Sequence, residues 1–293
     1  MNQPNEKGVQ KAPEQRISVA ERNYLTISEA VKGNGSVARA FRAMMGGDKT
    51  TTDQFLAVVF TALARNTKLL QDAEPMSLLD AIKTAASMGL TPLTEDGTIV
   101  VYDGKATFMP MYRGYLKRIR NSRMVEDIDC QIVYDEDDFK LTLGSEPDVH
   151  HIPALPERQE DGSQLGSGGY RGVYGIAWMP SGRRIVEWMT EAEINVIRDR
   201  YGATKKKSKY GKETPWDTNY GEMSRKTVLR RMSKRLPAAA VDALLAADAR
   251  ADELREQTVT ARIEKVDPAL EAIRQRALSA ATEGKTEEAK GEG

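Results

Sequence analysis

The sequence predicts an α/β protein of the α+β type, in which helices pack on a small antiparallel sheet. Apolar residues recur at helical spacing over roughly the first ninety positions, and alternation of apolar and polar residues replaces that spacing after Pro92. Helical spacing returns towards the end, in an Ala-rich segment that follows Pro237. The 293 residues, 40% of them hydrophobic, suffice for one large domain with appendages or for two domains.

The amino-terminal half is predicted to be helical after a short polar start. Residues 1–15 contain two prolines and few apolar side chains, so we expect them to be disordered. Glycine after a periodic segment marks several helix ends, and the third helix should bury Phe55, Val58 and Leu63. The predicted helices are Ser18–Val31, Ser36–Met45, Asp53–Ala64 after a Thr51–Thr52 cap, and Ser77–Met88.

Strands and tight turns are predicted from Pro92 to Met189. Asp103–Gly104 is a strong type I′ hairpin signal, because both residue types tolerate positive φ angles. Thr190-x-x-Glu193 is a capping box that opens a helix to about Tyr201, whereas Asp148–Gly169 reads as a loop. The other predicted elements are strands Thr98–Tyr102, Ala106–Met111, Glu126–Tyr134, Asp138–Leu143, Tyr170–Met179 and Arg183–Met189, and a helix over Tyr112–Asn121.

The composition along the chain predicts three parts. After the disordered start, residues 16–237 form the core. Residues 238–293 hold 12 acids and eight bases and end in a low-complexity charged stretch. We expect this last part to be an acidic, helical or disordered accessory tail.

The segment Pro215–Pro237 is the most informative stretch for function. It predicts a helix of about five turns, on which Val228, Leu229 and Met232 form one apolar stripe with Leu236. Most of its cations fall outside that stripe, so one face can pack on a core while the other binds a long polyanion. Nucleic acid is the natural candidate, and the predicted contacts are Lys226, Arg230, Arg231, Lys234 and Arg235.

A second basic segment mixes cations with aromatic rings. Residues 104–123 contain six cations and no acid, although the net charge of the chain is zero. Tyr112 and Tyr115 could stack on bases, but they also fit a buried helical stripe, and both roles stay open at this point. The cations that we expect to contact phosphates here are Arg113, Lys117, Arg118 and Arg120.

Three further features could contribute to binding, and two of them have two readings each. Trp216 either packs at the start of its helix or touches DNA at the mouth of a basic groove. The lysine-rich stretch 205–209 either closes over DNA or is a solvated loop. Gln54 is a weaker candidate for a phosphate or base contact.

The cysteine count and the hydropathy pattern indicate the cellular compartment. A single cysteine, Cys130, excludes an internal disulfide framework and fits an inert thiol on a strand in a reducing cytosol. No apolar run is long enough to span a membrane, and the start of the chain lacks a signal-peptide pattern. We therefore expect a cytoplasmic protein with no membrane association.

The order of motifs resembles the RecT family of phage and prophage single-strand annealing proteins. The matching segments lie between about Thr52 and Pro237. No single piece is decisive, but the combination in this order is specific. The pieces are AIKTAASMGLTPL, FMPMYRGYLKRIRNS, IVYDEDDF, YGIAWMPSGRRIVEWMT and PWDTNYGEMSRKTVLRRMSKRLP.

This resemblance implies ATP-independent binding of single-stranded DNA and annealing of complementary strands in phage homologous recombination. It implies a core distantly similar to the Rad52 annealing proteins, a bacterial host cytoplasm, and a homo-oligomer in the form of a ring or helical filament. The implied partners are single-stranded DNA, the annealed duplex intermediate, a phage exonuclease and a host single-strand binding protein. Annealing needs no covalent step, so we expect no enzyme activity and no cofactor, with magnesium dependence left open.

Other classes have weaker support. Asp135–Asp138, with His150 or His151, could hold magnesium in a nuclease, but consecutive residues point in different directions and do not converge on one metal. Gly284-Lys285-Thr286 mimics part of a phosphate-binding loop, yet Ser279 stands where that motif needs glycine. A sequence-specific DNA-binding accessory protein of replication is the remaining alternative, and it would prefer one duplex site.

Overall fold

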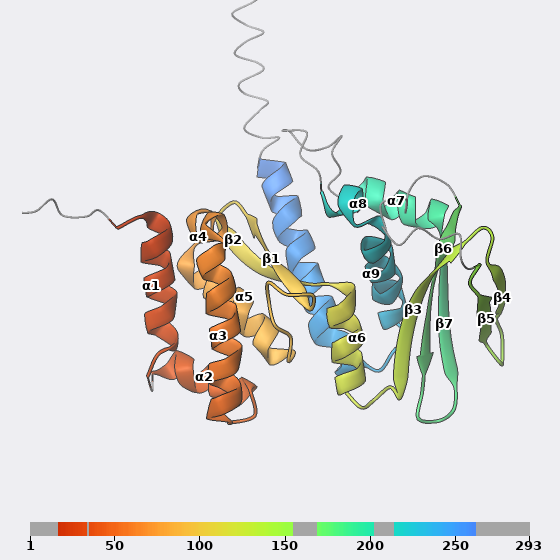
Figure 1. Cartoon of the computed structure of the whole chain (residues 1–293), viewed down its shortest axis with the longest axis horizontal. Helices are drawn as coiled ribbons and strands as arrows, with labels where there is room; N and C mark the ends of the chain where they lie inside the picture. The colour runs from red at the N-terminus through yellow and green to blue at the C-terminus, as the bar shows by residue number, and fades with distance from the viewer. Residues whose placement is uncertain (1–16, 34, 155–168, 202–213, 262–293) are drawn as a thin grey trace, which may run out of the picture.

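The structure is a computed structural model that describes residues 17–33, 35–154, 169–201 and 214–261. Helices at one end and small antiparallel sheets at the other form an elongated α+β arrangement, as Figure 1 shows. This confirms the predicted fold class. The lysine-rich stretch 205–209 and the motif around residues 279–286 lie outside the described residues.

Five helices form the amino-terminal end of the molecule. The side chain of Ser18 accepts a hydrogen bond from the Glu21 N–H and so begins the first helix where the sequence predicts it. Apolar stripes from these helices meet around Ile27, Phe41 and Leu63, which are fully buried. The helices are α1 (Val19–Val31), α2 (Ser36–Met44), α3 (Lys49–Arg65), α4 (Thr67–Asp72) and α5 (Pro75–Ser87).

Two predictions in this region are wrong in detail. Helix α3 begins four residues before Asp53, because the carboxylate of Asp48 accepts from the N–H groups of Thr50 and Thr51. Its buried stripe passes through Phe55 and Leu63 but leaves Val58 48% exposed. The short helix α4, capped by Asn66, was not predicted, since six residues are too few to show helical periodicity.

A hairpin and a helix connect the two ends of the molecule. Strands β1 (Gly97–Tyr102) and β2 (Lys105–Pro110) pair as predicted, and Asp103 and Gly104 both have positive φ angles at the turn. Helix α6 (Tyr112–Asn121) follows directly with its predicted bounds. It packs against the larger sheet and against a helix from the carboxy-terminal third of the chain.

The larger sheet has three antiparallel strands in the order β3-β6-β7. These are β3 (Asp127–Tyr134), β6 (Tyr170–Trp178) and β7 (Arg184–Thr190). One face is covered by helix α9 (Tyr220–Ser233), which approaches closely because Gly175 has no side chain: a Cβ there would lie 3.1 Å from Met232 Sδ. The apolar stripe Val228, Leu229, Met232 and Leu236 is buried, as predicted.

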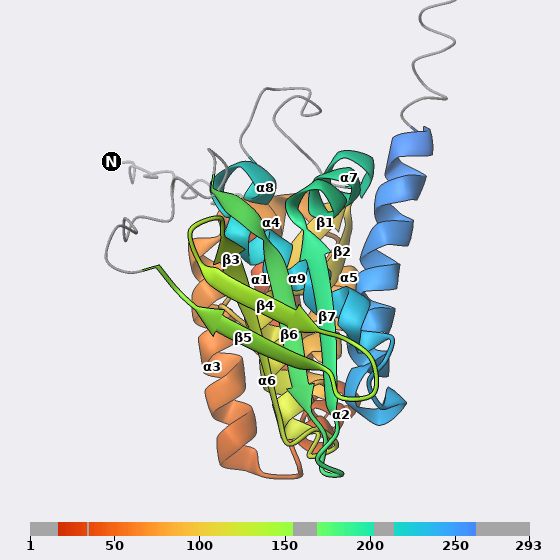
Figure 2. The ribbon, with the colours of Figure 1, turned by 90° about the vertical axis from the view of Figure 1, so that its right-hand side faces the viewer.

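The predicted five-turn basic helix is interrupted. Thr214 and Asp217 form a capping box that starts the short helix α8 (Pro215–Thr218), and Asn219 separates it from α9. Helix α7 (Glu191–Tyr201) begins at the predicted capping box, in which Thr190 N–H donates to Glu193 at 3.0 Å. Helices α7 and α8 lie at the same end of the sheet in both views of the ribbon (Figures 1 and 2).

The other face of the sheet is covered by the hairpin of β4 (Asp138–Thr142) and β5 (Asp148–Ile152). The sequence predicted only one of its two strands. Strand β4 was expected, but its partner β5 falls in a region that we predicted to be loop. Figure 2 shows both strands crossing the sheet. Phe139 stacks on Trp188 at 4.8 Å between ring centroids, and a small second core forms beneath the hairpin. The exposed, polar residues of β5 hid the strand from hydropathy analysis.

The helical segment 238–261, which follows the predicted boundary at Pro237, packs against the core. It is not separate from the core, because Val241 and Leu244 are buried in the same apolar cluster as α9 and the sheet. Ala251 and Leu254, further along the helix, are also buried. In Figure 1 this helix runs behind α6, between β1 and α9. An Ala-rich stripe with few large side chains gave little sign in the sequence that it packs here.

Candidate nucleic-acid interface

The cations of α9 do not form one continuous face. Lys226 and Arg230 turn towards the helix 238–261, whereas Arg231 and Arg235 turn towards β7. Lys234 is exposed and has no ion pair among the residues that the structure describes. Helical spacing correctly placed these side chains outside the apolar stripe. It did not show that the helix 238–261 covers one side of α9 and β7 covers the other.

A buried ionic cluster lies between α6, α9 and the helix 238–261. The side chain of Asp248 is 2% exposed; its Oδ1 lies 3.0 Å from Lys226 Nζ, and its Oδ2 accepts from the Tyr115 hydroxyl at 2.6 Å. Arg230 adds a contact to Asp252 at 2.7 Å. Burial alone would lower the pKa of Arg230, but the charges of Asp248 and Asp252 outweigh it and raise that pKa. We call Tyr115, Lys226, Arg230 and Asp248 the buried clamp.

The buried clamp contains two of the predicted DNA contacts. The side chain of Lys226 is 9% exposed, and Tyr115 is fully buried, so both lie below the surface in this structure. Burial, followed by the charge of Asp248, raises the pKa of Tyr115 well above its usual range. Arg230 remains partly accessible, with 39% of its side chain exposed. Tyr115 is therefore part of the buried core, which is one of the two roles that the sequence left open for it.

Three of the four predicted cations of α6 share an exposed face. Arg113, Lys117 and Arg120 have side chains 43–48% exposed and pair with Glu95, Asp96 and Asp127 respectively. Two of these acids come from the turn before β1. That turn fits closely against α6 because residue 114 is glycine: a Cβ there would lie 2.0 Å from the Asp96 carbonyl oxygen.

Tyr112 lies between two guanidinium groups at the start of α6. Arg113 Cζ is 5.7 Å from the centre of its ring and Arg225 Cζ is 5.5 Å from it. The ring and both arginines are at least partly exposed. Arg225 was not among the predicted contacts, although it stands in the same basic segment of the sequence. We call Tyr112, Arg113, Lys117 and Arg225 the α6 patch.

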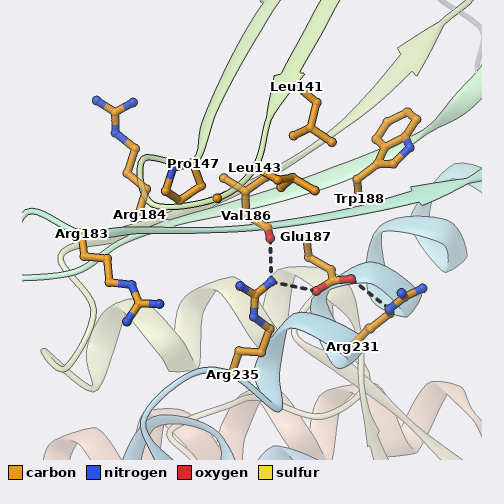
Figure 3. Close-up of a pocket in the computed structure, with 11 residues that line it drawn as sticks. Leu141, Leu143, Pro147, Arg183, Arg184, Val186, Glu187, Trp188, Arg231 and Arg235 are labelled. Carbon is orange, nitrogen blue, oxygen red and sulfur yellow. Dashed lines mark hydrogen bonds and ion pairs between the residues drawn. The ribbon is translucent and has the colours of Figure 1, made fainter.

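The cations on the other flank of α9 face a cavity beside β7. Figure 3 shows Arg231 and Arg235 both directed at Glu187, which lies 2.9 Å from Arg231 Nε and 3.2 Å from Arg235 Nη1. Arg231 also pairs with Glu193, and Arg235 donates to the Val186 carbonyl at 2.8 Å. Both side chains remain close to half exposed.

The remaining predicted contacts are scattered. Trp216 is buried and packs edge-on against Tyr220, which is the packing role that the sequence left open for it. Gln54 is exposed on α3, and Arg118 is partly buried with its Nε lacking a hydrogen-bond partner in the described structure. Arg120 is tied to Asp127 and to the Ile128 carbonyl.

The acidic stretch 135–138 has a structural role in this fold. The buried carboxylate of Asp137 accepts from the N–H groups of Tyr134 and Ala154 and lies 2.9 Å from His151 Nε2. These contacts close the base of the β4–β5 hairpin. Within the described ranges no group of three or more His, Cys, Asp or Glu side chains is placed to hold a metal ion. Cys130 is buried, and burial raises the pKa of its thiol.

No helix among the described residues is long and apolar enough to cross a membrane. The fold places partly exposed cations beside an accessible aromatic ring, a combination typical of proteins that bind single-stranded nucleic acid. The RecT family matches residues 53–265, which include α6, the sheet, α9 and the helix that supplies Asp248. The chain therefore belongs to the RecT family and is a phage-type single-strand annealing recombination protein.

Two curated relatives are similar to this chain in sequence. Protein RecT of Escherichia coli K12 is 26% identical over 197 residues, which cover 64% of this chain and 67% of the relative. The uncharacterised protein YqaK of Bacillus subtilis 168 is also 26% identical, over 198 residues that cover 67% of this chain. The alignment spans 62% of that second relative, just under two thirds of its length.

Proposed function

We propose that this protein pairs complementary single DNA strands without hydrolysing a nucleotide or cleaving a strand, and that DNA lies across the α6 patch. The α6 patch carries the proposal. It offers an aromatic ring next to cations whose side chains are partly exposed, whereas Lys226 of the buried clamp is held inside the protein. Stacking on the ring and pairing with phosphates both leave the base edges free for a complementary strand.

The ion pairs of the α6 patch do not oppose this role. Arg113 pairs with Glu95 at the surface, where such a pair stabilises the fold by only about 0–1 kcal/mol. A phosphate can therefore replace Glu95 at little cost. Asp96, the partner of Lys117, is only 14% exposed and also accepts a hydrogen bond from the Thr91 N–H, so it should stay in place. Arg guanidinium groups also match phosphate geometry with two parallel hydrogen bonds. The more exposed acid, Glu95 at 74%, should be the one that a phosphate displaces.

Further parts of the function rest on family membership. We infer that the protein acts as a homo-oligomer in the bacterial cytoplasm, together with an exonuclease that exposes single strands and a host single-strand binding protein. Family membership and the relatives in two bacteria support this inference. Arg231, Lys234 and Arg235 remain candidates for further phosphate contacts, because their side chains are exposed.

An annealing assay tests the proposal. Two complementary labelled oligonucleotides are added one after the other to the full chain, without nucleotide and with magnesium varied. We expect rapid pairing and intact strands. Cleavage that requires magnesium would instead favour a nuclease, and binding without pairing would leave only a single-strand binder. Preference for one duplex sequence would favour a replication accessory protein.

A further inference from the structure

The cavity beside β7 is separate from the α6 patch and shares no residue with it. It has a volume of about 310 Å³ and lies between β7, the end of α9 and the turn that joins β4 to β5. Figure 3 shows Arg183, Arg231 and Arg235 on one side of it, and apolar side chains together with Arg184 on the other. Its principal lining residues are Arg183, Arg184, Arg231, Arg235, Glu187, Leu141, Leu143, Pro147, Val186 and Trp188.

The cationic side of this β7 cavity is partly preorganised. Glu187 holds Arg231 and Arg235 from α9, and the Val186 carbonyl holds Arg235 a second time. Arg184 pairs with Asp148 at the rim, and Arg183 is exposed with no ion partner in the described part of the chain. The four arginines of the lining have three carboxylates as partners, Glu187, Asp148 and Glu193, which leaves a small excess of positive charge. Guanidinium groups fixed in this way lose little further entropy when an anion binds.

The opposite side is apolar and open to solvent. Leu143, at the turn between β4 and β5, is 65% exposed, although it is a large hydrophobic residue. Leu141 and Pro147 extend this surface towards Trp188. Apolar side chains beside arginine and tryptophan are the composition typical of the centre of a protein–protein interface.

We propose that the β7 cavity docks an acidic segment of a partner protein, with carboxylates on the arginines and an apolar side chain against Leu143. A peptide fits better than a nucleic acid, because Trp188 already stacks on Phe139 with 30° between the ring planes. The apolar edge of the cavity at Leu143 can instead contact a leucine or a similar side chain. The proposal goes beyond the annealing function and does not depend on it.

Fluorescence anisotropy tests the proposal with a labelled synthetic peptide of aspartates interrupted by leucines, added to the full chain. We expect binding that weakens at least about tenfold in the double variant Arg183→Ala/Arg184→Ala, and again in Leu143→Ser. Lys140→Ala, an exposed change on β4 outside the cavity lining, is the matched control and should leave the affinity unchanged. Peptides with lysine in place of aspartate, or serine in place of leucine, should bind correspondingly less.

The same variants are assayed for binding of oligo(dT) and for annealing. Unchanged DNA binding together with lost peptide binding supports a separate protein-docking site. Equal peptide binding by the double variant, or no peptide binding by the unaltered chain, overturns the proposal. A double variant that loses oligo(dT) affinity instead of peptide affinity also overturns it, and assigns the cavity to nucleic acid. Failure of annealing with peptide binding intact would count against the proposed function alone.

Discussion

The buried clamp and the α6 patch use the same kinds of residue for opposite purposes. Both combine tyrosine with lysine and arginine, and both lie where α6 meets α9. In the clamp, Asp248 is 2% exposed and binds Lys226 and Tyr115 inside the protein. In the patch, Arg113 and Lys117 are 48% and 43% exposed, and Glu95, the partner of Arg113, is 74% exposed. Burial of the cation together with its partner carboxylate therefore decides whether that cation holds the fold together or remains available to DNA.

Replacing Asp248 with asparagine should have the largest effect. The change leaves the charge of Lys226 buried without a partner, so the free energy of unfolding should fall by about 3–5 kcal/mol. Urea denaturation followed by circular dichroism measures this loss. The double variant Lys226→Met/Asp248→Leu removes both buried charges and should regain most of the stability.

The exposed pair between Lys49 and Asp53 provides the control for that experiment. Its side chains are 75% and 58% exposed, so Lys49→Met should change the free energy of unfolding by less than about 1 kcal/mol. A similarly small effect of Asp248→Asn would mean that solvent reaches the clamp, and the contrast between the two regions would disappear.

Tyr112→Ala should weaken single-strand binding by roughly 1–3 kcal/mol, because it removes the accessible ring of the α6 patch. Tyr112→Phe keeps the ring and should retain most of the affinity. Tyr115→Phe is the matched change in the clamp, where the ring is fully buried, and should leave binding unaltered. Anisotropy of a labelled oligonucleotide compares the three variants. Equal losses for Tyr112→Ala and Tyr115→Phe would remove the proposed difference in role.

Alkaline pH should reveal the buried Tyr115 hydroxyl through stability. The Tyr115 hydroxyl stays protonated in the folded protein above pH 10, whereas the unfolded chain ionises near that pH. The folded state then binds more protons, so its stability falls as pH rises, by about 1.4 kcal/mol per pH unit from this group. Denaturation at pH 9 to 11 should show a smaller decline for Tyr115→Phe than for the unaltered chain. Identical declines would contradict the burial of this hydroxyl.

Arg113→Ala and Lys117→Ala should have the smallest effect on the fold. Each should change the free energy of unfolding by less than about 1 kcal/mol, because both cations are close to half exposed. Each should also reduce the salt dependence of DNA binding by roughly one unit per lost phosphate contact. Lys68→Ala, an exposed change on α4, is the control. An unchanged salt slope in both variants would exclude these residues from the DNA surface.

Local signals predicted much of the fold. Asp103–Gly104 set the first hairpin, Thr190-x-x-Glu193 set the start of α7, and helical spacing identified the stripe of α9. Strand β5 was missed because its side chains alternate between exposed and only partly buried positions. The cap of α3 was misplaced because Asp48 competes with the threonines that follow it.

The candidate site was less predictable than the fold. The exposed face of α6 followed from spacing, but Arg225 gained its place beside Tyr112 only through the packing of α9 against α6. Lys226 looked equivalent to Arg231 in one dimension. Lys226 differs because it pairs with Asp248, which lies 22 residues later in the sequence, on the helix that follows Pro237.

By itself, the sequence determined the α+β class, most helix and strand positions, the basic segments and the family. These depend on short-range periodicity, capping and turn residues, whose physics acts within a few positions. Only the tertiary structure decided which cations are buried, which carboxylates neutralise them and which tyrosine is accessible. Those outcomes depend on desolvation and on pairing between side chains distant in sequence, as Asp248 with Tyr115 shows.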